Sequence, residues 1–257
     1  MSYWEDRLAA AQDKITAKNT KQIEKQLRKY YSRVTMSVLD DFEATYNKLL
    51  TTIADGKQPT PADLYKLDKY WKLQTQLRAR MQKLGDKQIA ALTKAFEANF
   101  FEVYYSLEVE GLSAFSTLDD ATVKQMINSI WVADGKTWSQ RVWDNVSRLT
   151  ETLNEGLISI VTTGKKSTEL KKILQERFNV SYGRASTLVK TELCHIQTQA
   201  AQKRYEDYGI QYVEVLVDVD KHTCDECKAL VGKKFPITAT PPLPVHPNER
   251  CALVPVL

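Results

Sequence analysis

The chain has 257 residues, of which 43% are hydrophobic and 26% charged, and its formal net charge is +4. This composition is ordinary for a globular protein and excludes collagen-like and low-complexity chains. No apolar run approaches the roughly 20 residues that span a bilayer, and the first residues lack the layout of a signal peptide. We therefore expect a protein made and kept in a cytosol, with no membrane partner. Four cysteines are too few for a disulfide scaffold and indicate thiols or metal ligands.

Most of the chain is predicted to be helical. Residues 5–50 contain neither Pro nor Gly, and a break follows at residues 55–61. Thr60 has the pattern of an N-cap because Pro61 comes next, and a helix should then run to about residue 108, which Gly85 can interrupt. Further helices are predicted over about 118–133, 137–162, 167–178 and from Ser181 to Gly209.

The pattern changes after the last of these helices. Residues 210–217 alternate and are rich in β-branched side chains, which predicts a strand. A cysteine-containing turn, a Pro-rich loop and a short strand near 252–256 follow. We therefore predict a mainly α protein with a small β C-terminal region (α+β). We divide it into a helical region, 1–135, and a C-terminal domain, 136–257.

Basic residues gather in the first predicted helix. Between residues 14 and 33 there are seven bases and one acid, and five of the bases fall on one stripe: Lys14, Lys18, Lys21, Lys25 and Arg28. Such a stripe can bind the phosphates of double-stranded DNA or an acidic partner, although a solvated helix face is the simpler interpretation. Trp4, so close to the start of the chain, is hard to bury and is a candidate anchor for a partner surface.

The strongest chemical signal is Cys224-x2-Cys227, then 18 intervening residues, then His246-x4-Cys251. Two cysteines on a tight turn can direct both sulfurs at one ion, and a loop can bring back the second pair. The four residues predict a tetrahedral Cys3His zinc site, structural because no position is left for water. Such a zinc would stabilise a small β unit that buries little core. The alternative is two loose thiols, a loop histidine and an unrelated cysteine.

Other patterns do not indicate an active site, and we predict that the protein is not an enzyme. No His-x-Glu or Cys-x-Glu precedes the cysteine pair, which excludes a zinc deaminase. Glu192-x-x-His195 occurs once where a di-iron bundle needs two such motifs, so we interpret it as a polar helix face with Cys194 partly buried. Glu108-x-Glu110 is similar to the Glu-x-Glu of ADP-ribosyltransferases. The other motifs of that class are missing, and we interpret the segment as solvated.

Four motifs stand close together near the end of the chain. They are Arg184-Ala185, Thr191-Glu192, Cys224-x-x-Cys227-x-x-Leu230-x-Gly232 and His246-Pro247-Asn248-x-Arg250-Cys251. Together they resemble the phage head morphogenesis family, the Mu F-like minor head proteins, over about residues 167–255. The opening Tyr3-Trp4-x-x-Arg7 is similar to the start of such proteins in siphophages of Gram-positive hosts. The chain departs from the family at Glu249, where a cysteine is often found, and this removes one possible ligand.

The resemblance implies a minor component of the phage head, present in few copies and located in the virion, inside the head or at the portal vertex. It would be made in the host cytoplasm and act in capsid assembly, genome packaging or delivery. Implied partners are the portal protein, reached through residues 1–135, and the major capsid or scaffolding protein. Some relatives bind DNA without sequence preference, and some carry an appended toxin domain. The alternative function is therefore nonspecific DNA binding by a protein that is packaged in the head and ejected with the genome.

Overall fold

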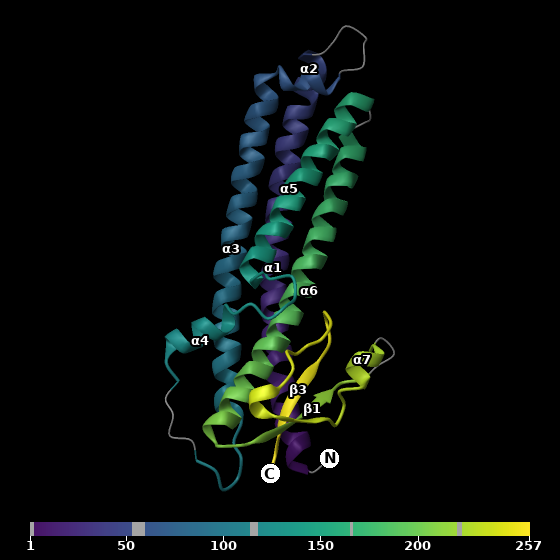
Figure 1. The fold of residues 1–257 in the computed structure, drawn as a ribbon. Helices are drawn as coiled ribbons and strands as arrows, with labels where there is room; N and C mark the ends of the chain where they lie inside the picture. The colour runs from purple at the N-terminus through teal and green to yellow at the C-terminus, as the bar shows by residue number, and fades with distance from the viewer. Residues whose placement is uncertain (1–2, 53–59, 114–117, 165–166, 220–222) are drawn as a thin grey trace. The chain divides into compact units, whose positions relative to one another are not determined.

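The computed structural model describes residues 3–52, 60–113, 118–164, 167–219 and 223–257. Within these ranges the chain is mainly helical and ends in a small antiparallel sheet, which confirms the predicted fold class. None of the described helices has an apolar stretch long enough to cross a membrane. Figure 1 shows the elements, which are α1 (Tyr3–Thr52), α2 (Pro61–Tyr65), α3 (Asp68–Ser106), α4 (Asp120–Ile127), α5 (Trp138–Thr163), α6 (Ser167–Asp207), β1 (Tyr212–Val217), α7 (Asp225–Lys228), β2 (Lys234–Pro236), the 3-10 turn η1 (Ile237–Ala239) and β3 (Cys251–Val256).

These elements form two compact units, and each unit is assembled from separate stretches of the chain. Unit 1 contains Met1–Glu24, Ala91–Trp138 and Ser186–Leu257, whereas unit 2 contains Lys25–Ala90 and Ser139–Ala185. Helices α1, α3 and α6 therefore contribute to both units. The predicted division into residues 1–135 and 136–257 was a division by function. Each compact unit contains residues from both predicted regions, and the functional division stays a prediction.

Unit 2 is a helical bundle made of stretches of α1, α3, α5 and α6, with the short α2 at one end (Figure 1). Each stretch buries side chains at the three- and four-residue spacing of one helix face. These apolar stripes form the core of the unit, and they include Leu27, Tyr31, Val38 and Phe42 of α1, Leu73, Leu77, Met81 and Leu84 of α3, Val142, Val146, Leu149 and Leu153 of α5, and Leu170, Leu174 and Phe178 of α6.

The predicted interruption of the helix between residues 178 and 181 is wrong, because α6 continues through it. Ser181 is buried in unit 2 rather than acting as a cap. Its hydroxyl lies 3.1 Å from the Tyr31 hydroxyl, and its carbonyl accepts a hydrogen bond of 2.9 Å from Asn145 Nδ2. These tertiary contacts override the local preference of Asn179-Val180-Ser181 for a helix end.

The predicted start at Thr60 is confirmed, but the helix that begins there is short. Thr60 and Asp63 form a capping box, in which each side chain accepts from the other residue's backbone N–H. Helix α2 then ends at Tyr65, whose carbonyl accepts a 2.7 Å hydrogen bond from Trp71 Nε1. Helix α3 starts after this turn and runs without a break through Gly85.

Unit 1 contains the sheet, whose strand order is β2-β1-β3 with both pairs antiparallel. The strands predicted over 210–217 and 252–256 are confirmed as β1 and β3, whereas β2 was not predicted because three residues show no alternation. Helix side chains cover the outer edge of β3: Gln197 Nε2 donates to the Cys251 carbonyl at 2.9 Å, and Gln12 Nε2 donates to the Leu253 carbonyl at 2.8 Å. The edge is therefore paired rather than open to another chain.

Helix α4, also in unit 1, is shorter than the predicted 118–133. Asp119 caps it by accepting from the Thr122 N–H, and it ends at Ile127. The chain then leaves the helix, and the Trp131 ring stacks on the His195 ring with 4.0 Å between centroids. Trp131 is partly buried in this stack and in its hydrogen bond to Glu192, which accompany the early end of the helix.

Two helical glycines of unit 2 provide a matched test of its packing. A Cβ on Gly85 would lie 2.3 Å from the Trp143 ring, whereas a Cβ on Gly183 would meet no atom within 4 Å. Gly183→Ala should stabilise the protein by about 0.5–1 kcal/mol through helix propensity alone. Gly85→Ala should instead destabilise it by about 1 kcal/mol or more, because overpacking outweighs that gain. Urea unfolding of both variants measures the difference, and equal stabilisation of the two would contradict the packing of Trp143 on α3.

Candidate metal centre

Three of the four predicted metal ligands come together in unit 1. The ligand atoms of Cys224, Cys227 and His246 all lie within 4.8 Å of one another. His246 Nδ1 is 3.1 Å from the Cys224 Sγ and 3.5 Å from the Cys227 Sγ. Zinc bonds of about 2.3 Å to sulfur and 2.0–2.1 Å to nitrogen put neighbouring tetrahedral ligands about 3.5 Å apart. The observed separations therefore fit one tetrahedral ion.

The local sequence explains why the two cysteines face the same way. Cys224 is the N-cap of α7, in extended conformation, and its Sγ accepts a 3.3 Å hydrogen bond from the Cys227 N–H. This single turn of helix places the two sulfurs on one side, as the Cys-x-x-Cys spacing predicts.

Glu226 lies on the far side of the histidine. Its Oε2 is 3.4 Å from His246 Nε2, the ring nitrogen that faces away from the sulfurs. A carboxylate near Nε2 favours the tautomer with the proton on Nε2, which leaves the lone pair on Nδ1 for a metal. Our sequence analysis missed Glu226, although its position between the two cysteines was visible.

The Cys227 thiol is in an environment that opposes ionisation when no metal is bound. Burial raises its pKa to about 12, together with the hydrogen bond to Cys224 and the negative charge of Glu249. A divalent cation reverses this electrostatic balance, because it stabilises both thiolates directly. The site is therefore suited to a cation and disfavours free thiolates.

Cys251, the fourth predicted ligand, lies outside this group of ligand atoms. It starts β3, is 2% exposed, and is in contact with Cys194 of α6. The Cys251 N–H donates to the Cys194 Sγ at 3.3 Å, and the Cys194 thiol donates to the Cys251 carbonyl at 3.7 Å. Burial and the neighbouring Cys194 raise the pKa of Cys251. Its role as a metal ligand stays a prediction.

The residues of Glu192-x-x-His195 do form a polar helix face, but this face is buried, and Cys194 is buried with it. Every residue of α6 from Thr191 to Thr198 is buried. Glu192 accepts a 2.9 Å hydrogen bond from Trp131 Nε1, and His195 Nδ1 lies 2.6 Å from the Leu243 carbonyl, so its N–H donates there. Polar residues face inward because the C-terminal strand and loop cover this part of the helix.

The same stretch of α6 holds the loop that carries His246. His195 binds the loop at Leu243, upstream of His246, and the Thr191 hydroxyl accepts from the Asn248 N–H at 3.2 Å, downstream of it. Asn248 has φ = +67°, a conformation that asparagine tolerates better than most residues. The loop is therefore fixed on both sides of the histidine.

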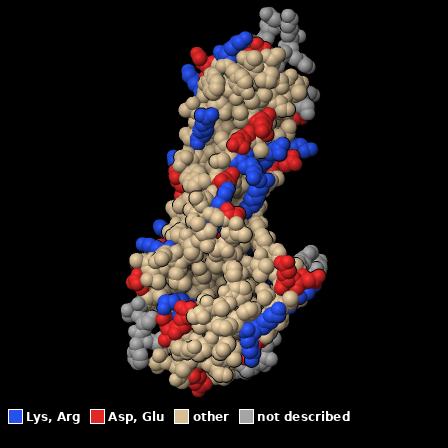
Figure 2. Space-filling model, in the orientation of Figure 1, with Lys and Arg blue, Asp and Glu red and all other residues tan. Residues whose placement is uncertain are grey.

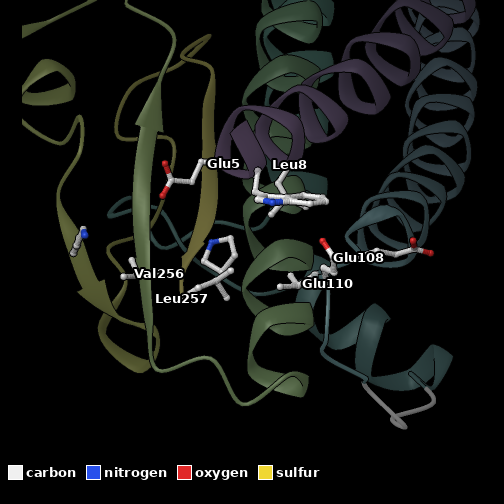
Figure 3. Close-up of a pocket in the computed structure, with 10 residues that line it drawn as sticks. Glu5, Leu8, Glu108, Glu110, Val256 and Leu257 are labelled. Atoms are coloured by element: carbon white, nitrogen blue, oxygen red, sulfur yellow. The ribbon is translucent and has the colours of Figure 1, made fainter. Parts of the chain in front are cut away.

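Trp4 lies next to a separate pocket of unit 1, of about 330 Å³. It is 38% exposed, and the Arg7 guanidinium lies 5.2 Å from its ring centroid. Figure 3 shows Glu5 and Glu108 on opposite sides of this pocket. The full lining is Trp4, Glu5, Leu8, Glu108, Val109, Glu110, Lys234, Pro255, Val256 and Leu257. The pocket thus combines apolar walls with an acidic rim, and the exposed Glu108 and Glu110 flank the buried Val109.

The predicted basic stripe is divided between the two units. Lys14, Lys18 and Lys21 belong to unit 1, and Lys25 and Arg28 belong to unit 2; all five are exposed. Lys18 forms an ion pair with Glu102 at 3.3 Å, and the Arg28 guanidinium lies 5.3 Å from the Tyr182 ring centroid. Exposure is compatible with a binding role, and that role stays a prediction.

Comparison with known proteins bears on the part of the chain that carries this centre. Residues 151–254 match the family model described as "Phage Mu protein F like protein". This stretch is similar to Mu F-like proteins. The match confirms the predicted resemblance to the phage head morphogenesis family, and it includes Cys224, Cys227 and His246.

One curated relative is an enzyme. The "NAD(+)--arginine ADP-ribosyltransferase EFV" of Enterococcus faecalis (strain ATCC 700802 / V583) is 25% identical to the chain over 150 residues. The match covers 56% of this chain but only 30% of the enterococcal protein, so the chain spans less than a third of that relative. The enzymatic activity in that name belongs to the relative. No solved structure matches the chain.

Removing both sulfurs of the α7 turn tests whether they hold a metal. The variant with Cys224→Ser and Cys227→Ser should contain almost no zinc, whereas Cys194→Ser, which removes a thiol outside the centre, should keep it. Because bound metal stabilises the folded state, a chelator should lower the unfolding temperature of the wild type and leave that of the double variant unchanged. Metal analysis and thermal unfolding measure both effects, and a double variant with normal zinc would contradict the site.

Buried His195 should make the protein sensitive to acid. Burial lowers its pKa from 6.5 to about 4, with a smaller opposing effect of the hydrogen bond to Leu243. Between these pH values the unfolded chain binds the proton and the folded chain does not, so stability is complete above pH 6.5 and falls as the pH drops toward 4. His195→Asn should remove about 2–3 kcal/mol of the loss between pH 7 and pH 4.5, measured by urea unfolding at both values. An unchanged difference between the two pH values would contradict the buried neutral imidazole.

Proposed function

We propose that the protein is a minor head protein of a phage that associates with the portal vertex and acts in capsid assembly, genome packaging or delivery. The observation that carries the proposal is the similarity of residues 151–254 to Mu F-like proteins. The centre within that stretch supports a structural role, because thiolates and an imidazole are the ligands of zinc sites that stabilise small folds. The proposed location is the virion.

The proposed metal is zinc, held by Cys224, Cys227 and His246. It would join the α7 turn to the loop that α6 holds, two segments separated by 18 residues of chain. A three-stranded sheet buries little apolar surface of its own, so a metal can supply much of its stability. Cys251 remains the predicted fourth ligand. With one side chain bound in addition to these three, the zinc would have four protein ligands.

The proposed partner surface is the pocket beside Trp4. Its apolar walls can receive a side chain of the portal, major capsid or scaffolding protein, and the carboxylates of Glu5, Glu108 and Glu110 favour a partner segment with Lys or Arg. A half-exposed tryptophan at the edge of such a pocket is the residue type that most often dominates binding energy.

The test of this surface is incorporation into particles. Trp4→Ala should reduce the amount of the protein per portal in proheads, because loss of such an anchor costs about 2 kcal/mol, or roughly thirtyfold in affinity. Trp71→Ala is the matched control, since Trp71 is also half exposed but lies in unit 2. Quantitative mass spectrometry of purified proheads gives the ratio to the portal protein. Equal incorporation of both variants would mean that Trp4 does not bind a head component.

The alternative is a nonspecific DNA-binding protein that is packaged in the head and ejected with the genome. It is favoured by the exposure of Lys14, Lys21, Lys25 and Arg28 along α1. Figure 2 shows lysines, arginines and acidic residues interspersed over one face of the molecule. This distribution argues against a broad basic surface on that face. Phosphate binding would therefore depend on these individual side chains more than on the overall charge.

Salt dependence distinguishes this alternative. A variant with Lys14, Lys21 and Lys25 changed to Ala should bind duplex DNA more weakly and with a shallower salt dependence, by about 0.9 in the log–log slope for each lost phosphate contact. The control variant changes Lys72, Lys83 and Lys94, which are equally exposed on α3. A mobility shift measured from 50 to 200 mM salt tests both, and identical behaviour of the two variants would reject the stripe as a DNA site.

A further inference from the structure

The pocket beside Trp4 adjoins a second hollow of unit 1, which has a volume of about 640 Å³. Trp4 and the segment Glu108-Val109-Glu110 line both of them. From these shared residues the pocket extends to Glu5 and the end of β3, whereas the second hollow extends to Arg7 and to the last part of α6. We call the pocket and the second hollow together the Trp4 groove.

Two guanidinium groups line the second hollow. Arg7 of α1 lies one helical turn from Trp4 and contacts its ring. Arg204 of α6 contacts two rings, with 4.9 Å to the centroid of Tyr104 and 4.4 Å to that of Tyr208. Aromatic faces hold a guanidinium group in place but leave its charge available. Within the described part of the chain, neither arginine forms an ion pair with a carboxylate.

The carboxylates of the groove are distributed differently. Glu5 lines the pocket and not the second hollow, and Figure 3 shows it across the pocket from Glu108 and Glu110. Lys234 contributes one positive charge to the pocket. Among the described residues, Glu108 and Glu110 have no ion pair with a base. The groove is therefore acidic toward Glu5 and basic toward the two arginines.

Helix α6 fixes the segment that the two parts of the groove share. The Leu107 carbonyl accepts a hydrogen bond of 3.2 Å from Arg204 Nε and one of 3.1 Å from the Tyr208 hydroxyl. The exposed Glu108 and Glu110 follow this anchored residue, so their backbone is held beside the arginines. Charges on a fixed backbone need no ordering when a ligand binds, which favours binding of a ligand with the complementary charges.

We propose that the Trp4 groove binds one extended segment of a protein partner, with a base and an acid on either side of an apolar residue. The inference rests on the proposed partner surface and adds the side with the two arginines. The apolar residue packs on Trp4 and Val109, and the base pairs with the carboxylates. The acid pairs with the guanidinium groups, which match a carboxylate in two parallel hydrogen bonds. Duplex DNA fits poorly, because the carboxylates repel its phosphates.

Photo-cross-linking in proheads identifies the occupant. Benzoylphenylalanine is introduced at Leu112, an exposed residue of the second hollow, or at Leu257, an exposed residue of the pocket. Both positions should cross-link to the same segment of one head protein, identified by mass spectrometry. An acid should lie next to the Leu112 cross-link and a base next to the Leu257 cross-link. Benzoylphenylalanine at Met36, which is exposed in unit 2, is the control and should not reach that segment.

Charge reversal tests the acid of the partner. Arg7 is the arginine to change, because Arg204 also holds the Leu107 carbonyl. Arg7→Glu should lower incorporation into proheads about tenfold, since like charges would then meet, and Arg7→Lys should stay within about threefold of the wild type. Asp6→Lys is the matched control, because Asp6 is exposed and lines neither part of the groove. Changing the cross-linked acid of the partner to Lys should restore incorporation of Arg7→Glu.

The outcomes separate this inference from the proposed partner surface. Normal incorporation of Trp4→Ala, with no cross-link to a head protein from either position, would overturn both. Reduced incorporation of Trp4→Ala together with normal incorporation of Arg7→Glu would leave the surface and overturn the inference. A cross-link from Leu112 to DNA, or to a segment without an acid beside the cross-link, would also overturn it.

Discussion

Unit 1 depends on one stretch of helix that is buried on all sides. Between Thr191 and Thr198, α6 has no solvated face, and this stretch includes a glutamate, a histidine, a glutamine and two threonines. A buried polar group without a partner costs about 1–3 kcal/mol, so each of these side chains constrains what packs against it. Gln197 binds the edge of β3, and His195 and Thr191 bind the loop before it. The helix therefore determines the course of the last fifteen residues of the chain.

The metal centre follows from this constraint. The loop that α6 holds carries His246, and the α7 turn carries the two sulfurs. These two segments are joined by a short strand, a 3-10 turn and a Pro-rich loop, none of which has a large core. A metal bound between them would join the α7 turn to the loop that α6 holds. Helix α6 would then preorganise the site, because it fixes the position of the His246 loop before the ion binds.

The sequence predicted most of the helices and the two longer strands, because apolar spacing and β-branched alternation are local signals. It also predicted that Cys224, Cys227 and His246 come together, since their spacing is a local signal too. It did not predict that α6 passes through Ser181, or that Glu192 and His195 are buried. Both depend on residues far away in the chain, such as Tyr31, Trp131 and Leu243. The contacts of Cys251 with Cys194 were not visible in the sequence either, for the same reason.

The most direct test of the account is zinc X-ray absorption on the purified full chain. The account predicts one zinc per chain with at least two sulfurs at about 2.3 Å and an imidazole nitrogen at about 2.0–2.1 Å. A chain without bound zinc, or a zinc shell that contains no sulfur, would contradict it.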